Sequence, residues 1–138
     1  MSRIYVDHRA GDDLVVFTVK GKIDLPALIA ATDAHYAAHA THRTLFDLRD
    51  ADGSNLSFRE MKTTYAEQRS THVPDGAPQS ALLVRNEASL GLARLYGVIT
   101  ESHDTAMIYE AFLSVNEAET WLHLPRGTLS DMAGTSGN

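Results

Sequence analysis

Acidic, hydroxyl and amide side chains that can bind a cation gather in one stretch of the sequence. They are Asp47, Asp50, Asp52, Ser54 and Asn55. Carboxylates crowded on a loop can hold calcium or magnesium. An EF-hand loop starting at Asp50 requires glycine at position 55 and glutamate at position 61, where this chain has asparagine and methionine. Turn formation by Asx side chains explains the same residues.

The same stretch follows a predicted strand, and α/β proteins usually bind ligands at the carboxyl ends of their strands. We therefore treat the segment from Asp50 to Ser57 as a candidate interaction loop. Its polar members are Asp50, Asp52, Ser54, Asn55 and Ser57.

Histidines supply a second group of potential ligands. His35 and His39 are four residues apart on a predicted helix, and His42 follows just beyond it. Two imidazoles at this spacing can share a zinc ion, but the zincin pattern needs glutamate directly after the first histidine, where this chain has Tyr36. We interpret the histidines instead as part of a solvated polar helix face. We predict no metal site.

No motif for covalent catalysis or cofactor binding is present. The chain has no cysteine, which excludes disulfides, thiolate zinc sites and cysteine nucleophiles. It also lacks the Gly-x-Ser-x-Gly elbow, the phosphate-binding loop and the dinucleotide fingerprint. We therefore expect a protein that is not an enzyme and needs no cofactor.

Size and charge narrow the class of protein further. The 138 residues suit one domain, and 12 basic against 18 acidic residues give a net charge of −6. This balance argues against nucleic-acid binding and allows at most peripheral membrane contact. No apolar run reaches the ~18 residues of a membrane span, and no signal peptide is visible, so we expect a cytoplasmic protein.

The hydrophobic pattern predicts an α/β domain with the element order ββαβαβαβα. Short runs rich in β-branched residues predict strands at 3–8, 14–20, 45–49, 80–85 and 106–109. Apolar residues at helical spacing predict helices at 25–40, at 57–72, at 88–102 and after Ser114. We expect one domain over 1–124 and a disordered tail over 125–138, which is rich in Gly, Ser and Thr.

Strands separated by helices predict a mixed, mostly parallel five-stranded sheet with right-handed crossovers and an antiparallel first strand. In the central strand Leu45, Asp47 and Arg49 share one face, and Phe46 and Leu48 share the other. This pattern predicts a sheet that is fully covered on one face and only partly on the other, so we expect the helices on one side and a second surface left for water, a ligand or a partner.

Two segments carry a resemblance to a known family. Residues 45–49 (LFDLR) and 91–97 (GLARLYG), in this order of elements, resemble the bacterial SpoIIAA-like family, which is related in fold to STAS domains. The resemblance covers roughly residues 3–124 and implies a right-handed β-α superhelix. It also implies a family largely without assigned biochemistry, in which likeness to CRAL-TRIO lipid carriers suggests apolar ligands or membrane contact.

The resemblance also indicates where a regulatory site would lie. STAS antagonists carry an Asp-Ser-Ser-Gly signature at the tip before the second helix, and a partner kinase phosphorylates one of its serines. This chain departs from the signature at residues 55–58, where only Ser57 can stand for a serine. Ser57 and Glu60 also form a capping-box pattern, which explains the serine without phosphorylation.

The second predicted helix has a thin apolar stripe made by Phe58, Met61 and Tyr65. A helix held by few apolar side chains opens more easily than its neighbours. One interpretation is a lid over an apolar ligand site; the alternative is an ordinary edge helix. The facing residues in the third helix would be Leu92, Tyr96 and Val98.

Arg94 lies in the middle of the third predicted helix. Its guanidinium group can bind the anionic head group of a ligand, or it can pair with a surface carboxylate from Glu87, Glu101 or Asp47. We include it with Phe58 and Leu92 among the candidate ligand-binding residues.

Taken together, these features predict a non-enzymatic binding module that holds a small apolar or amphipathic ligand or docks another protein. The alternative is a STAS-type regulatory interaction domain without an intact phosphorylation signature. A half-polar sheet face and a short edge strand also predict a homodimer.

Overall fold

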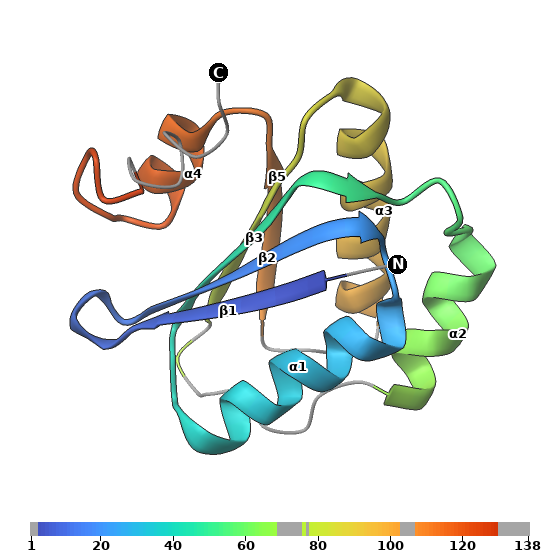
Figure 1. Cartoon of the computed structure of the whole chain (residues 1–138), viewed down its shortest axis with the longest axis horizontal. Coiled ribbons are helices and arrows are strands. Elements are labelled where there is room, and N and C mark those ends of the chain that lie inside the picture. The colour runs from blue at the N-terminus through green and yellow to red at the C-terminus, as the bar shows by residue number, and fades with distance from the viewer. Residues whose placement is uncertain (1–2, 69–75, 77, 103–106, 130–138) are drawn as a thin grey trace.

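The computed structural model describes residues 3–68, 76, 78–102 and 107–129. The sheet consists of β1 (Arg3–Arg9), β2 (Leu14–Lys22), β3 (Arg43–Asp52), β4 (Gln79–Leu83) and β5 (Ile108–Phe112). The helices are α1 (Leu25–Ala38), α2 (Phe58–Gln68), α3 (Glu87–Ser102) and α4 (Val115–Trp121), with a 3-10 turn at Ala10–Asp12. The predicted order of elements is confirmed (Figure 1).

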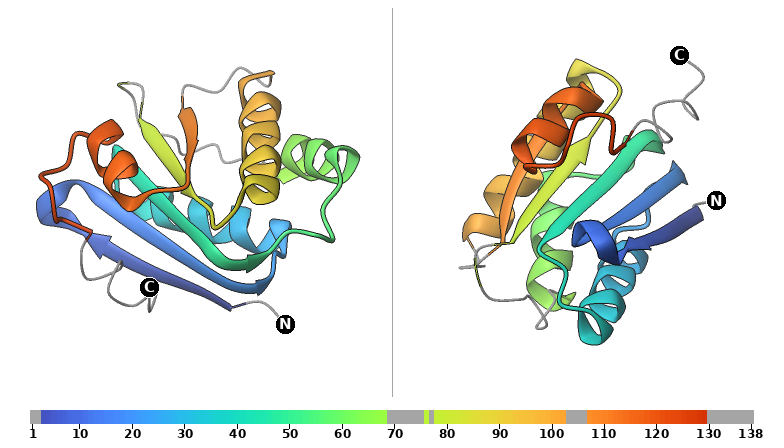
Figure 2. Two further views of the ribbon diagram at one scale, coloured as in Figure 1. Left: turned by 90° about the horizontal axis from the view of Figure 1, so that it is seen from above. Right: turned by 90° about the vertical axis from the view of Figure 1, so that its left-hand side faces the viewer.

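The strands lie side by side in the order β1-β2-β3-β4-β5. Strand β1 is antiparallel to β2, and all other neighbours are parallel, as predicted. Because each parallel strand is added to the same edge, right-handed crossovers bring α1, α2 and α3 to one face of the sheet. The last helix, α4, follows β5 without a crossover and covers the opposite face (Figures 1 and 2).

The two faces of the sheet each carry part of the core. On the α1–α3 face, Val15, Phe17 and Phe46 are buried, and the rings of Phe17 and Phe46 stack 5.3 Å apart. On the other face, Leu14 and Leu45 pack under α4 with a group that also includes Leu83, Ala118 and Leu122. The expectation that the helices lie on one side of the sheet is therefore wrong for α4, which covers one end of the second face.

The third strand of the chain extends further toward its C-terminal end than predicted. Asp50 and Asp52 belong to β3 and not to a polar loop. Beyond an irregularity in the register between Thr18 and Lys20, Asp50 lies opposite Lys20 in the register of β2. Opposite charges at facing positions of neighbouring strands are compatible with this pairing despite the low strand propensity of aspartate.

The C-terminal boundary also differs. We predicted a disordered tail from residue 125, but Leu129 is fully buried among Leu14, Leu122 and Leu124. Residues 130–138 of the predicted tail lie outside the described residues. The last strand likewise begins at Ile108 and not at residue 106.

Candidate functional site

The first candidate site is the loop that joins β3 to α2, together with the first turn of that helix. Ser57 is the N-cap, because its hydroxyl oxygen accepts a hydrogen bond from the Glu60 backbone N–H at 3.1 Å. The same hydroxyl lies 3.3 Å from the Glu60 carboxylate and donates to it. The capping function predicted for Ser57 is confirmed, although Glu60 contacts the hydroxyl and not the Ser57 backbone N–H.

Hydrogen bonds hold this loop in one shape. The Asp52 carboxylate accepts from the Ser54 backbone N–H at 2.9 Å, and the pKa of Asp52 is lowered by its hydrogen bonds to Ser54. The Asn55 amide donates to the Ile23 carbonyl at 3.2 Å, which fastens the loop to the start of α1. Asp52, Ser54 and Asn55 are nevertheless exposed, so a partner can reach them.

Phe58 departs from its predicted role. This side chain is 47% exposed, lies directly after the N-cap, and does not line the apolar cavity of the protein. In the sequence it directly follows Ser57 and lies close to Ser54 and Asn55, and all three of these polar residues are exposed. We call these four residues the loop surface.

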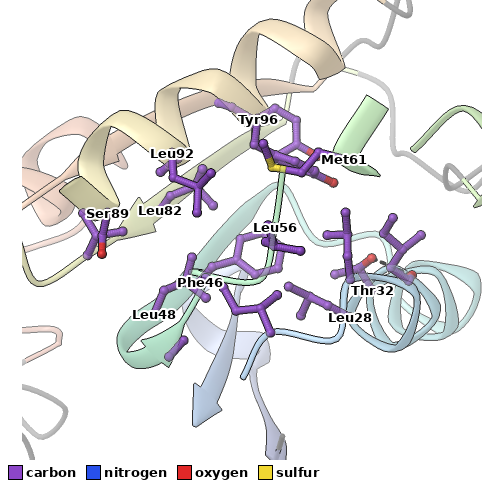
Figure 3. Close-up of a pocket in the computed structure, with 18 of the residues that line it drawn as sticks. Leu28, Thr32, Phe46, Leu48, Leu56, Met61, Leu82, Ser89, Leu92 and Tyr96 are labelled. Carbon is purple, nitrogen blue, oxygen red and sulfur yellow. Dashed lines mark hydrogen bonds between the residues drawn. The ribbon is translucent and has the colours of Figure 1, made fainter. Parts of the chain in front are cut away.

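An apolar cavity of about 100 Å³ lies between α1, α2, α3 and the sheet. Met61, Leu92 and Tyr96, three of the residues predicted to contact a ligand, line it and point toward one another (Figure 3). Phe46 and Leu82 of the sheet form another part of the wall. The structure thus brings the predicted residues of two helices together around one space.

Other predicted ligand-binding residues lie elsewhere. Arg94 is exposed, and Val98, which we expected to face the second helix, is 59% exposed on the outer side of α3. Both face away because they lie outside the stripe that Leu92, Tyr96 and Ile99 make at helical spacing. Tyr65 belongs to α2, but its side chain lies outside the described part of the structure.

The first helix supplies part of the cavity wall that the sequence analysis did not assign to a ligand. Leu28, Thr32 and Tyr36 lie on its inner face and line the cavity (Figure 3). Their helical spacing was visible in the sequence and predicted burial, which is confirmed. Periodicity cannot distinguish a residue packed against a neighbour from one that faces a cavity.

We expect α2 to exchange its amide hydrogens about tenfold or more faster than α3, because few apolar side chains hold it. Among the described side chains of α2, residues 58–64, only Met61 is buried. Helix α3 buries Leu90, Ala93 and Ile99. Hydrogen exchange followed by mass spectrometry checks this, and equal protection of the two helices would rule out a lid.

Comparison with solved structures places this arrangement in a known fold. An anti-sigma factor antagonist from Mycobacterium paratuberculosis matches with a TM-score of 0.56 and 20% identity over 89% of this chain and 95% of that chain. An uncharacterized protein of the DUF3478 family from Shewanella loihica, with a SpoIIAA-like fold, also matches. The TM-score is 0.50 and the identity is 15%, over 88% of this chain and 93% of that chain. This chain has a SpoIIAA-like fold. Neither protein-family models nor curated proteins gave a match.

The SpoIIAA-like fold was expected from residues 45–49 and 91–97, and the comparison confirms it. At these identities the likeness shows the fold alone. None of the described helices is both long and apolar enough to cross a bilayer.

Three histidines of the SpoIIAA-like domain form a cluster between β1 and α1. The ring of His8 lies 5.0 Å from that of His35 and 4.2 Å from that of His39. His35 is buried, and its Nε2 lies 2.5 Å from the Thr41 hydroxyl. The prediction of a solvated polar face is therefore wrong for His35, because β1 places His8 over it.

The cluster does not form a metal centre. His42 lies apart from it and contacts the Asp13 carboxylate through Nδ1 at 3.0 Å. Within the described residues, no three potential ligands are arranged to hold a metal ion. The contribution of His8 was missed because the sequence analysis considered only the histidines of one helix.

Acid is expected to destabilise the domain through this cluster. Burial, together with the charges of His8 and His39, lowers the pKa of His35 from 6.5. The unfolded chain therefore takes up a proton on His35 at a higher pH than the folded chain does. The contribution of neutral His35 to the free energy of unfolding is fully present above pH 6.5 and is lost as the pH falls through the lowered pKa. Urea unfolding between about pH 8 and about pH 5 measures this loss.

The control is the His35→Gln variant, which cannot titrate at this position and keeps a polar group near Thr41. We expect its stability to fall less steeply over the same pH range. Parallel pH profiles for the two proteins would show that His35 is not responsible.

An ion pair lies on the sheet face opposite α1–α3. The Arg49 guanidinium donates two hydrogen bonds to the Asp47 carboxylate, both of 2.9 Å. Hydrogen bonding to Asp47 raises the pKa of Arg49. The acidic stretch considered for cation binding thus already has basic partners, since Arg85 likewise pairs with Asp50.

Proposed function

We propose that this chain is a non-enzymatic regulatory domain that acts in the cytoplasm by docking another protein through its loop surface. The observation that carries the proposal is the apolar Phe58 side chain, which is 47% exposed and lies close in the chain to the exposed polar residues Ser54, Asn55 and Ser57. Aromatic anchors surrounded by polar groups are typical of protein interfaces.

The fold and the chemistry of the site support this proposal. A structural neighbour is an anti-sigma factor antagonist, and the loop surface occupies the tip at which the STAS resemblance places a regulatory signature. The loop is held by hydrogen bonds from Asn55 and to Asp52, so little ordering is required when a partner binds. The partner we expect offers an apolar recess for the Phe58 ring, bordered by hydrogen-bonding groups.

Affinity capture with the full chain tests the proposal. We expect the Phe58→Ala variant to retain less of the partner by about tenfold or more, because truncating an anchor of this kind costs about 2 kcal/mol. The matched control is Val98→Ala, which removes a similarly exposed apolar side chain from α3. If Phe58→Ala and Val98→Ala capture the same proteins in the same amounts, the loop surface is not the docking site.

A homodimer is also part of the proposal. Strand β1 is an edge of the sheet, and its Tyr5 and Val6 are about half exposed. An unpaired edge with exposed apolar side chains favours association with a second copy. Light scattering of the purified chain tests this, and a monomer at micromolar concentration would exclude it.

A further inference from the structure

The apolar cavity carries an inference that does not depend on protein docking. It lies under α2, where Met61 and Leu92 approach from two helices and Leu28 approaches from a third (Figure 3). Apolar cavities of about 150 Å³ remain dry and bind benzene-sized molecules. The volume of about 100 Å³ found here is of the same order.

The chemistry of the wall restricts the ligand. Among the described residues that line the cavity there is no lysine, arginine, histidine, aspartate or glutamate. Of its polar groups, the Thr32 hydroxyl donates to the Ile29 carbonyl at 2.8 Å, and the Tyr36 hydroxyl is bonded to Thr44. A charged ligand group placed here would lose its hydration without gaining a counter-ion, which is strongly unfavourable.

We propose that this cavity is a binding site for a neutral, apolar small molecule about the size of one aromatic ring. The site is lined by aliphatic and aromatic side chains of α1, α2, α3 and the sheet. Its apolar character provides the binding energy, and the lack of lining charges excludes carboxylates and phosphates.

The loop before α2 forms part of the rim. A Cβ atom added to Gly53 would lie 2.6 Å from a methyl group of Leu92 and 3.5 Å from one of Ile23. Glycine at this position therefore lets the loop approach α3 closely. Leu56, whose backbone N–H donates to the Gly53 carbonyl at 2.9 Å, also lines the cavity.

Calorimetric titration of the free protein with toluene and with benzoate tests the proposal. We expect saturable binding of toluene, and binding of benzoate weaker by about tenfold or more, because the carboxylate would lose part of its hydration and meet no cationic side chain among the described lining residues. No protein partner is present, so failure of this test leaves the docking proposal untouched, and failure of docking leaves this one untouched.

Cavity-filling variants locate the bound ligand. Ala51→Leu and Ser89→Leu each add a side chain at the wall and are expected to weaken toluene binding about tenfold or more. The control, Ala34→Leu, makes the same change as the first at an exposed position of α1. Two filling sites keep the test valid if one variant does not fold.

Three results would overturn the proposal. They are no saturable toluene binding to the wild-type chain, equal binding of toluene and benzoate, and full toluene binding by both folded filling variants.

Discussion

Replacing Leu129 by alanine is expected to lower the free energy of unfolding by about 2–5 kcal/mol, the range for large-to-small changes in a packed core. Leu129 is fully buried against Leu14 of β2 and Leu122 at the end of α4. Alanine would leave a cavity between the sheet and this segment. Urea denaturation followed by circular dichroism measures the loss.

Glu119 shows why the segment around Leu129 is fixed in place. This carboxylate is 2% exposed and accepts hydrogen bonds from the backbone N–H groups of Gly127 at 3.3 Å and Leu129 at 2.6 Å. The control variant is Arg126→Ala, because Arg126 is exposed in the same segment. We expect this substitution to change the free energy of unfolding by at most about 0.5 kcal/mol. Equal stability of the Leu129→Ala and Arg126→Ala proteins would contradict the packing described here.

Replacing Asp47 by alanine is expected to lower the free energy of unfolding by about 3 kcal/mol, because the largely buried Arg49 guanidinium loses the carboxylate that accepts two of its hydrogen bonds. The side chains of Asp47 and Arg49 are only 10% and 14% exposed. The Asp47 carboxylate also accepts from the Arg49 backbone N–H at 3.2 Å, so the substitution removes a backbone partner as well. The same urea denaturation measures the effect.

Asp50→Ala provides a matched control on the same strand. Its carboxylate pairs with Arg85, but these side chains are 50% and 60% exposed, so water screens the pair. We expect this variant to lose at most about 1 kcal/mol. Similar losses for Asp47→Ala and Asp50→Ala would mean that burial does not distinguish the two ion pairs.

Much of the fold could be predicted from the sequence because its local patterns agree with one another. The β-branched run of β2 and the helical spacing of Leu28, Thr32 and Tyr36 each indicate one structure. Ser57 caps its helix as predicted, and Ser114, after which a helix was predicted, is the N-cap of α4. The alternation of strands and helices then restricts the topology through the handedness of crossovers.

The remaining features depend on contacts between distant parts of the chain. Asp50 extends β3 alongside β2, where it lies opposite Lys20, and His35 is buried where β1 brings His8 against it. Leu129 lies in a stretch rich in Gly, Ser and Thr, a composition that predicts disorder. Its backbone N–H nevertheless donates a hydrogen bond to the Glu119 carboxylate. None of these pairings produces a periodic signal in the sequence.

The candidate site was predictable only in part for the same reason. Met61, Leu92 and Tyr96 were assigned together because helical stripes face one another, and they do line one cavity. Phe58 belongs to the same sequence pattern as Met61, but it is the first residue of α2 and is 47% exposed. Helical spacing does not show whether the first turn of a helix is covered by other elements.

Site-specific photo-crosslinking in living cells tests the central claim, docking of a protein on the loop surface, most directly. A photoreactive phenylalanine at position 58 is expected to crosslink to one defined protein, while the same group at position 98, exposed on α3, is not. Crosslinks from position 98 to the same protein with equal yield, or none from position 58 while the chain is folded, would contradict the account.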